Sequence, residues 1–113
     1  MAFDNPLAGE IWSAKYRFNP NGDGEGDASV SATWRRVASA LAEAEAPGSR
    51  ARWRESFLEA LTDFQFLPAG RILAGAGTGR KVTLFNCFVM GSIPDDLGDI
   101  FEQVREAALT MQQ

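Results

Sequence analysis

The sequence predicts an α/β chain in which a mainly helical first part is followed by one strand and one further helix. Three observations support this prediction. Apolar residues recur with helical spacing between residues 30 and 64, an apolar run without polar alternation follows at 82–90, and amphipathic spacing returns at 95–112. A strand followed by a helix is the first half of a βαβ unit, so we expect the strand to need neighbours in a sheet.

The beginning of the chain predicts an arm followed by a loop. Residues 7–18 carry apolar side chains at mixed spacing, which indicates a short helix or docking arm that needs a partner surface. Residues 19–27 are rich in asparagine, aspartate and glycine and contain no apolar side chain, which predicts a mobile loop. Part of this loop matches the start of an EF-hand calcium loop, but Val30 stands where the closing glutamate is required, so a plain loop is favoured.

Two helices are predicted next, and they form a helical hairpin over residues 28–67. The apolar face of the first carries Val30, Trp34, Val37, Ala38 and Leu41, and that of the second carries Trp53, Phe57, Leu61 and Phe64. Asp27, Ser29 or Ser31 is suited to cap the start of the first helix. The dipeptide Pro47-Gly48 ends that helix, so the two apolar faces meet in one shared seam.

The composition changes at Pro68, where a glycine-rich stretch begins. Its spacing completes neither a P-loop nor a dinucleotide-binding fingerprint, because the required lysine and third glycine are missing. A tight turn is the favoured interpretation, and a turn whose backbone N–H groups bind a phosphate is the alternative. Residues 82–90 then predict a strand buried on both faces, and residues 95–112 predict an amphipathic helix.

Composition and charge argue against several classes of function. The 113 residues carry a net charge of −4 with no basic run, which argues against non-specific binding to nucleic acid. No apolar run reaches the ~20 residues that span a bilayer, and the N-terminus does not resemble a signal peptide. One cysteine cannot form an internal disulfide, and histidine is absent. We therefore expect a soluble, cytoplasmic protein with no metal site and no membrane or nucleic-acid partner.

The single cysteine, Cys87, has two interpretations. On an apolar strand a lone cysteine is more often a buried small hydrophobic residue than a reactive thiol. No base and no second cysteine stand near Cys87 in the sequence. The residues alone favour packing, and a redox role stays open.

Three segments of the chain carry a family resemblance. Residues 66–90 read FLPAGRILAGAGTGRKVTLFNCFVM, residues 5–16 read NPLAGEIWSAKY, and residues 108–113 read ALTMQQ. Together they resemble the N-terminal segment of ribonucleotide reductases, most closely the class II branch, which depends on adenosylcobalamin (vitamin B12). The match at 66–90 is the most specific of the three.

The resemblance implies a division of the chain. Residues 1–27 would be the N-terminal arm and flexible loop, and residues 28–67 the helical N-terminal reductase domain. Residues 68–113 would begin a ten-stranded α/β catalytic barrel with a glycine-rich turn, the strand at 82–90 and the helix at 95–112, truncated at the end of the chain.

The resemblance also implies site residues. Cys87 would be one of two redox-active cysteines that reduce the substrate ribose and form a disulfide, with the partner cysteine outside this chain. Gly70, Asn86 and Cys87 match positions that contact the nucleotide substrate, and many family members have serine or threonine at the first two. Asp95, Asp96 and Leu97 match the start of a loop that senses a deoxynucleotide effector, although an aspartate N-cap explains the same residues.

The implied activity is the conversion of ribonucleotides, as diphosphates, to deoxyribonucleotides by radical chemistry for DNA synthesis. Its cofactor would be adenosylcobalamin, bound mainly by residues outside this chain. The implied partners are the remainder of the reductase polypeptide, the ribonucleotide substrate, a deoxynucleotide effector and a thioredoxin-type reductant. The chain is expected to be inactive alone, and the alternative is a non-catalytic helical interaction module derived from the same family.

Overall fold

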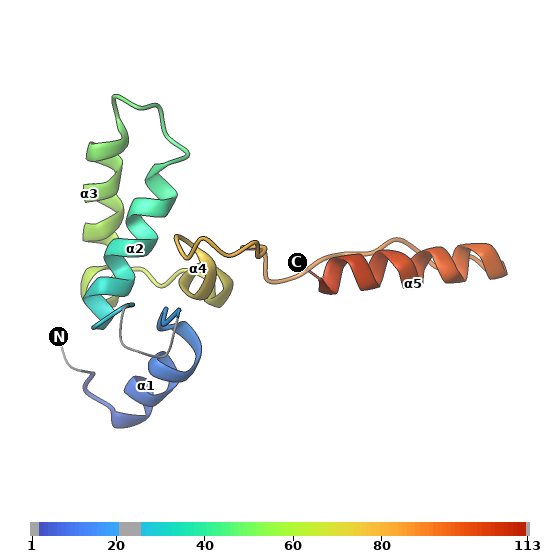
Figure 1. The fold of residues 1–113 in the computed structure, drawn as a ribbon, viewed down its shortest axis with the longest axis horizontal. Helices are drawn as coiled ribbons and strands as arrows, with labels where there is room; N and C mark the ends of the chain where they lie inside the picture. Colours follow the sequence, from blue (N-terminus) through green and yellow to red (C-terminus); the bar gives the residue numbers. More distant parts are fainter. Residues whose placement is uncertain (1–2, 21–25, 113) are drawn as a thin grey trace.

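The computed structural model describes residues 3–20 and 26–112, which form a helical body up to residue 80 and a C-terminal arm over residues 82–112 (Figure 1). In chain order the elements are α1 (Pro6–Ile11), the π-helical turn η1 (Trp12–Tyr16), α2 (Val30–Ala42), α3 (Arg50–Leu61), the 3₁₀ turn η2 (Thr62–Phe64), α4 (Gly70–Gly75) and α5 (Leu97–Met111). Helices α2 and α3 lie side by side, and α5 points away from them (Figure 1).

Helix α2 forms where the sequence predicts it and supplies most of the core. Ser29 caps it, since its side-chain oxygen accepts a hydrogen bond from the Ala32 N–H at 3.3 Å. Its apolar face is buried, with Val37 fully covered. The core cluster consists of Val30, Trp34, Val37, Ala38, Leu61, Leu73 and Ala76. Four of these seven side chains come from α2, which confirms the amphipathic pattern.

Helix α3 is confirmed as the second helix of the hairpin, but its predicted apolar face is only partly buried. Leu61 is buried at its end, whereas Trp53 stacks on Phe57 near the surface with ring centroids 5.6 Å apart. Phe64 does not belong to the helix, because Asp63 and Phe64 turn into the left-handed region with φ values of 55° and 58°. That turn redirects the Phe64 ring onto the edge of Trp34, 5.2 Å between centroids.

The short helix predicted at the start of the chain is confirmed as α1, and the arm docks on α2. Asn5 caps α1 by accepting a hydrogen bond from the Leu7 N–H at 2.9 Å. Trp12 then donates from Nε1 to the Thr33 hydroxyl on α2 at 3.0 Å. The side chains of Trp12 and Tyr16 pack against the core cluster. The arm finds its partner surface inside the same chain.

The predicted loop at 19–27 is described only at its two ends, and residues 21–25 lie outside the described residues. The two ends meet: the Asp27 N–H donates to the Phe18 carbonyl at 2.8 Å, and Arg17 Nε donates to the Asp27 carbonyl at 2.8 Å. The base of the loop is therefore closed by backbone and side-chain hydrogen bonds.

The prediction of a glycine-rich turn at 68–79 needs correction, because residues 70–75 form α4. The helix forms because its apolar residue Leu73 is buried against the core. The turn itself is confined to the residues after α4. Gly77 has a φ of 72°, and a Cβ there would come within 2.9 Å of Arg36 Cγ. Glycine satisfies both the backbone conformation and the close approach.

The prediction of a strand at 82–90 is wrong, because these residues form no strand in the structure. No strand occurs in residues 3–20 or 26–112, and the segment runs beside α5 without regular structure (Figure 1). The predicted burial fails as well, since Val89 is 99% exposed. The physical reason is that a strand exists only through hydrogen bonds to a neighbouring strand, and none of the described segments supplies one.

The last predicted helix is confirmed as α5, Leu97–Met111. Asp96 caps it, because its Oδ1 accepts hydrogen bonds from the Gly98 N–H at 2.9 Å and the Asp99 N–H at 3.2 Å. None of its described residues is buried. Its apolar stripe, which includes Leu97 at 70% exposure, therefore faces solvent in this chain.

Candidate functional site

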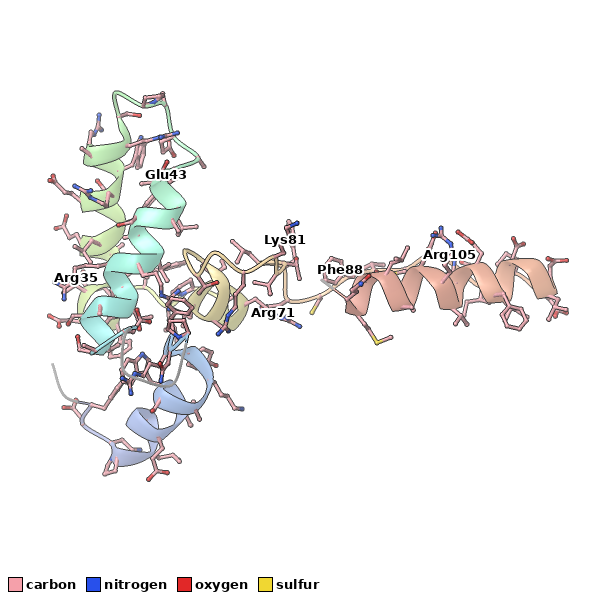
Figure 2. The ribbon with its side chains drawn as sticks, in the orientation of Figure 1. Arg35, Glu43, Arg71, Lys81, Phe88 and Arg105 are labelled. Carbon is pink, nitrogen blue, oxygen red and sulfur yellow. The ribbon has the colours of Figure 1, made fainter. Side chains whose placement is uncertain are left out.

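The structure brings together the two segments that contain the predicted substrate residues. Gly70 is the first residue of α4. The next residue, Arg71, donates its backbone N–H to Oδ1 of Asn86 at 3.3 Å. Gly70 and Asn86 are thus held near each other across a separation of sixteen positions in the sequence. Figure 2 shows Arg71 on α4, at the junction between the helical body and the C-terminal arm.

Cys87 follows Asn86 directly and is exposed. The sequence-based expectation of a cysteine buried on a strand is therefore incorrect. Its thiol has no disulfide partner in this chain, which contains one cysteine. Phe85 and Phe88 flank this part of the segment, and their rings meet edge to face with centroids 6.3 Å apart. The cysteine is therefore accessible beside a position that contacts α4.

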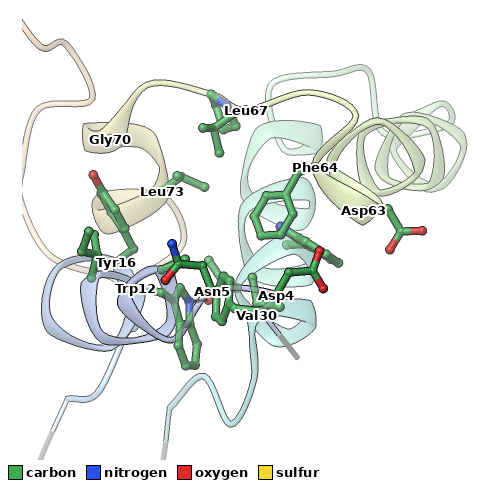
Figure 3. Close-up of a pocket in the computed structure, with 16 residues that line it drawn as sticks. Asp4, Asn5, Trp12, Tyr16, Val30, Asp63, Phe64, Leu67, Gly70 and Leu73 are labelled. Atoms are coloured by element: carbon green, nitrogen blue, oxygen red, sulfur yellow. Dashed lines mark hydrogen bonds between the residues drawn. The ribbon is translucent and has the colours of Figure 1, made fainter. Parts of the chain in front are cut away.

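A pocket of about 660 Å³, lined in part by Gly70, lies between the N-terminal arm, α2 and the segment leading into α4 (Figure 3). Its walls are mainly aromatic and aliphatic, and they include Trp12, Trp34 and Phe64. Tyr16 and Gly70 line the same pocket, and Figure 3 shows the Tyr16 hydroxyl directed toward the start of α4. Sequence reasoning missed Tyr16, because its only signal was an aromatic residue in an arm of mixed spacing.

Arg36 is the centre of a buried polar network that bonds to two residues lining this pocket, Tyr16 and Leu73. Its Nη2 lies 2.8 Å from Oδ2 of Asp27, and the two side chains are only 10% and 5% exposed. The same guanidinium donates to the carbonyl of Leu73 at 2.9 Å, to the carbonyl of Tyr16 at 3.3 Å and to the carbonyl of Ala76. One side chain of α2 thus ties the N-terminal arm to α4.

Asp27 was predicted only as one of three candidate caps, and the structure gives it a different role. Burial would raise the pKa of its carboxyl group. Hydrogen bonds from Arg36, from the Phe18 N–H at 3.1 Å and from the Thr33 hydroxyl at 2.7 Å outweigh burial, so the pKa lies below its ordinary value of 3.8. The carboxylate stays ionised and paired with the guanidinium.

The predicted effector residues lie in the C-terminal arm, away from the pocket. The side chain of Asp96 is occupied as the N-cap of α5, which confirms the capping interpretation of this residue. Asp95 and Leu97 are exposed on either side of it. No contact joins these three residues to Gly70 or Asn86 among the hydrogen bonds of the described chain.

Residues 3–20 and 26–112 contain no cluster of three or more histidine, cysteine, aspartate or glutamate side chains placed to hold a metal ion. Across the same residues, no helix has the length and apolar character required to cross a membrane.

Comparison with known families supplies the remaining observation. A family model described as "Ribonucleotide reductase, all-alpha domain" matches residues 2–81. The chain belongs to this family. The matched range covers the helical body, including α4 and the turn after it, and ends where the C-terminal arm begins.

The relatives among curated proteins agree with this assignment. Two proteins named "Vitamin B12-dependent ribonucleoside-diphosphate reductase", from two strains of Mycobacterium tuberculosis, are each 37% identical to the chain over 73 residues. The aligned region covers 65% of this chain and 10% of each relative, so the chain spans about a tenth of the length of the relatives it matches. No solved structure gives a significant match.

Proposed function

We propose that this chain is part of a ribonucleotide reductase and supplies Cys87 as one thiol of the redox-active pair. The observation that carries the proposal is the hydrogen bond from the Arg71 N–H to Asn86 Oδ1. It holds the Asn86-Cys87 dipeptide near Gly70, so the positions assigned to the substrate by resemblance share one region of the molecule. The exposure of Cys87 fits a thiol that must meet a substrate and a second cysteine.

The proposed chemistry balances with two thiols. A ribonucleotide loses its 2′ hydroxyl as water, the ribose carbon gains hydrogen, and the two thiols are oxidised to a disulfide. Cys87 supplies one thiol, and the partner cysteine lies outside this chain. A thioredoxin-type reductant then returns the disulfide to two thiols by exchange.

The radical source that we propose for the whole enzyme is adenosylcobalamin, following the name of the relatives. The aligned region covers only 10% of each relative, so most of the enzyme that would bind the cofactor lies outside this chain. We therefore assign cobalamin binding to parts of the enzyme other than this chain, and no step here depends on it.

We also propose a substrate class and an effector region. A ribonucleoside diphosphate is the proposed substrate, since the relatives are named for that class. The effector region is proposed at Asp95, Asp96 and Leu97. With Asp96 occupied as a cap, Asp95 and the 70% exposed Leu97 have their side chains available for a deoxynucleotide.

The test is a reconstitution with the remainder of the reductase supplied as a second polypeptide, in the presence of adenosylcobalamin and a dithiol reductant. We expect turnover of a ribonucleoside diphosphate with the natural chain and none with Cys87→Ser. The matched control is Ser56→Ala on the exposed face of α3, which should leave turnover unchanged. Undiminished turnover with Cys87→Ser would show that Cys87 is not a redox residue.

A second candidate, a non-catalytic interaction module, is favoured by the apolar stripe of α5 that lies open in this chain. The same variant separates the two candidates. A module keeps its binding to the second polypeptide with Cys87→Ser and has no activity to lose. Pull-down of the second polypeptide, measured beside turnover, reports which description holds.

A further inference from the structure

The ring of Tyr16 occupies the space in which a side chain at position 70 would stand. A Cβ built on Gly70 would lie 3.2 Å from Tyr16 Cε1 and 3.4 Å from the Tyr16 hydroxyl oxygen. The first distance is tighter than an ordinary van der Waals contact. The hydroxyl of Tyr16 therefore stands immediately beside the backbone of Gly70, fifty-four positions later in the sequence.

Arg36 holds Tyr16 and Gly70 next to each other by bonding to the backbone of both the arm and α4. Nη2 of Arg36 donates to the Tyr16 carbonyl at 3.3 Å and to the Leu73 carbonyl at 2.9 Å, so one guanidinium fixes both the arm and α4. That guanidinium is fixed in turn by Asp27 at 2.8 Å. The contact between Tyr16 and Gly70 is therefore fixed by a buried hydrogen-bond network.

The Tyr16 hydroxyl is free to bind something else. Its ring packs against the core and lines the pocket, but its hydroxyl makes no hydrogen bond within the described part of the chain, and Figure 3 shows the hydroxyl directed toward the start of α4. A phenol both donates and accepts a hydrogen bond. Gly70, in contrast, offers only backbone groups at this point.

We propose that Tyr16 is a substrate-positioning residue whose hydroxyl hydrogen-bonds to the nucleotide beside Gly70. The arm thereby supplies the hydroxyl group that a glycine cannot carry. This inference rests on the proposed function, because it requires the nucleotide to lie at Gly70 and Asn86. It adds a contact that comes from the N-terminal arm and not from the segment at 70–87.

The first test is Tyr16→Phe in the reconstituted reductase, which removes one oxygen and keeps the ring. We expect KM for a ribonucleoside diphosphate to rise about threefold to tenfold, the usual effect of losing one hydrogen bond. The value of kcat and the melting temperature should remain within experimental error of the natural chain. Ser13→Ala, on the exposed side of the same η1 turn, is the matched control and should change neither constant.

The second test uses the fact that the chain contains one tyrosine. Replacing it biosynthetically with fluorotyrosine gives a single ¹⁹F resonance in a complex with the unlabelled second polypeptide. Adding a ribonucleoside diphosphate should shift this resonance, whereas inorganic phosphate alone should not reproduce the full shift.

The results of these experiments separate the role of Tyr16 from the proposed reductase function. If the natural chain turns over and Cys87→Ser does not, but Tyr16→Phe keeps its KM and the resonance stays in place, only the role of Tyr16 is overturned. If the natural assembly never reduces a nucleotide, both proposals are overturned.

Discussion

The helical body and the C-terminal arm both contain amphipathic helices, but the apolar face is buried in the body and exposed in the arm. In the body, α2 packs against α3, α4 and the N-terminal arm, and the buried core of the described residues lies there. In the arm, α5 has a comparable apolar stripe and no buried residue. The comparison shows that amphipathic spacing predicts where a helix lies, while burial requires a second surface that matches it.

The largest expected effect comes from breaking the polar centre of the body. Arg36→Met removes the guanidinium that bonds to Asp27, Tyr16, Leu73 and Ala76, and it leaves a buried carboxylate without its partner. We expect a loss of about 3–5 kcal/mol in the free energy of unfolding, measured by urea titration of the chain.

The control for this prediction is the neighbouring arginine. Figure 2 shows Arg35 on the side of α2 away from α4, and its side chain is exposed. Arg35→Met should change the free energy of unfolding by no more than about 0.5 kcal/mol. Equal losses for the two variants would mean that the buried network does not organise the body.

The next effect compares one substitution in both regions. Leu73→Ala removes a side chain that is 8% exposed in the body, and we expect it to cost about 2–5 kcal/mol through lost burial and a cavity. Leu97→Ala removes a side chain that is 70% exposed on α5 and should cost less than about 0.5 kcal/mol. Thermal unfolding of the two variants in parallel measures the difference.

The difference between the effects of Leu73→Ala and Leu97→Ala should become smaller when the second polypeptide is present. If α5 is a docking element, Leu97→Ala will then weaken the complex although it leaves the free chain unchanged. A Leu97→Ala variant as unstable as Leu73→Ala in the free chain would contradict the exposed position of α5.

The smallest effect is the dependence of stability on pH. The folded-state pKa of Asp27 is lowered, so its ionised form contributes stability above its ordinary value of 3.8. That contribution begins to disappear as the pH falls below this value and is lost as the pH passes through the lower folded-state pKa. Asp27→Asn, although less stable at neutral pH, should lose less further stability than the natural chain between about pH 5 and about pH 3.

The local parts of this fold were predictable from the sequence, and the long-range parts were not. The spacing of Trp34 and Val37 predicts α2, and an aspartate before Leu97 predicts the start of α5, because helices and caps are made by residues close in sequence. The helix at Gly70–Gly75 escaped prediction, since glycine disfavours helices and only packing of Leu73 on the core compensates.

In the candidate site, too, the residues could be named from the sequence, but their long-range contacts could not be predicted. Resemblance indicated Gly70, Asn86 and Cys87, but no pattern predicted that Asn86 would bond to the N–H of Arg71. The sequence offers Asp27, Ser29 and Ser31 as alternative caps of α2; the structure gives the cap to Ser29 and pairs Asp27 with Arg36. Residues that act through distant partners leave no periodic signal.

The sequence alone determined the helices α2, α3 and α5, the family resemblance and the presence of one cysteine, since all of these depend on local order and residue type. Only the tertiary structure decided that Arg36 joins the arm to α4, that Tyr16 fills the space beside Gly70 and that residues 82–90 lack a sheet. The physical reason is that a helix closes its hydrogen bonds within itself, whereas a strand, an ion pair or a contact site depends on what the rest of the chain brings beside it.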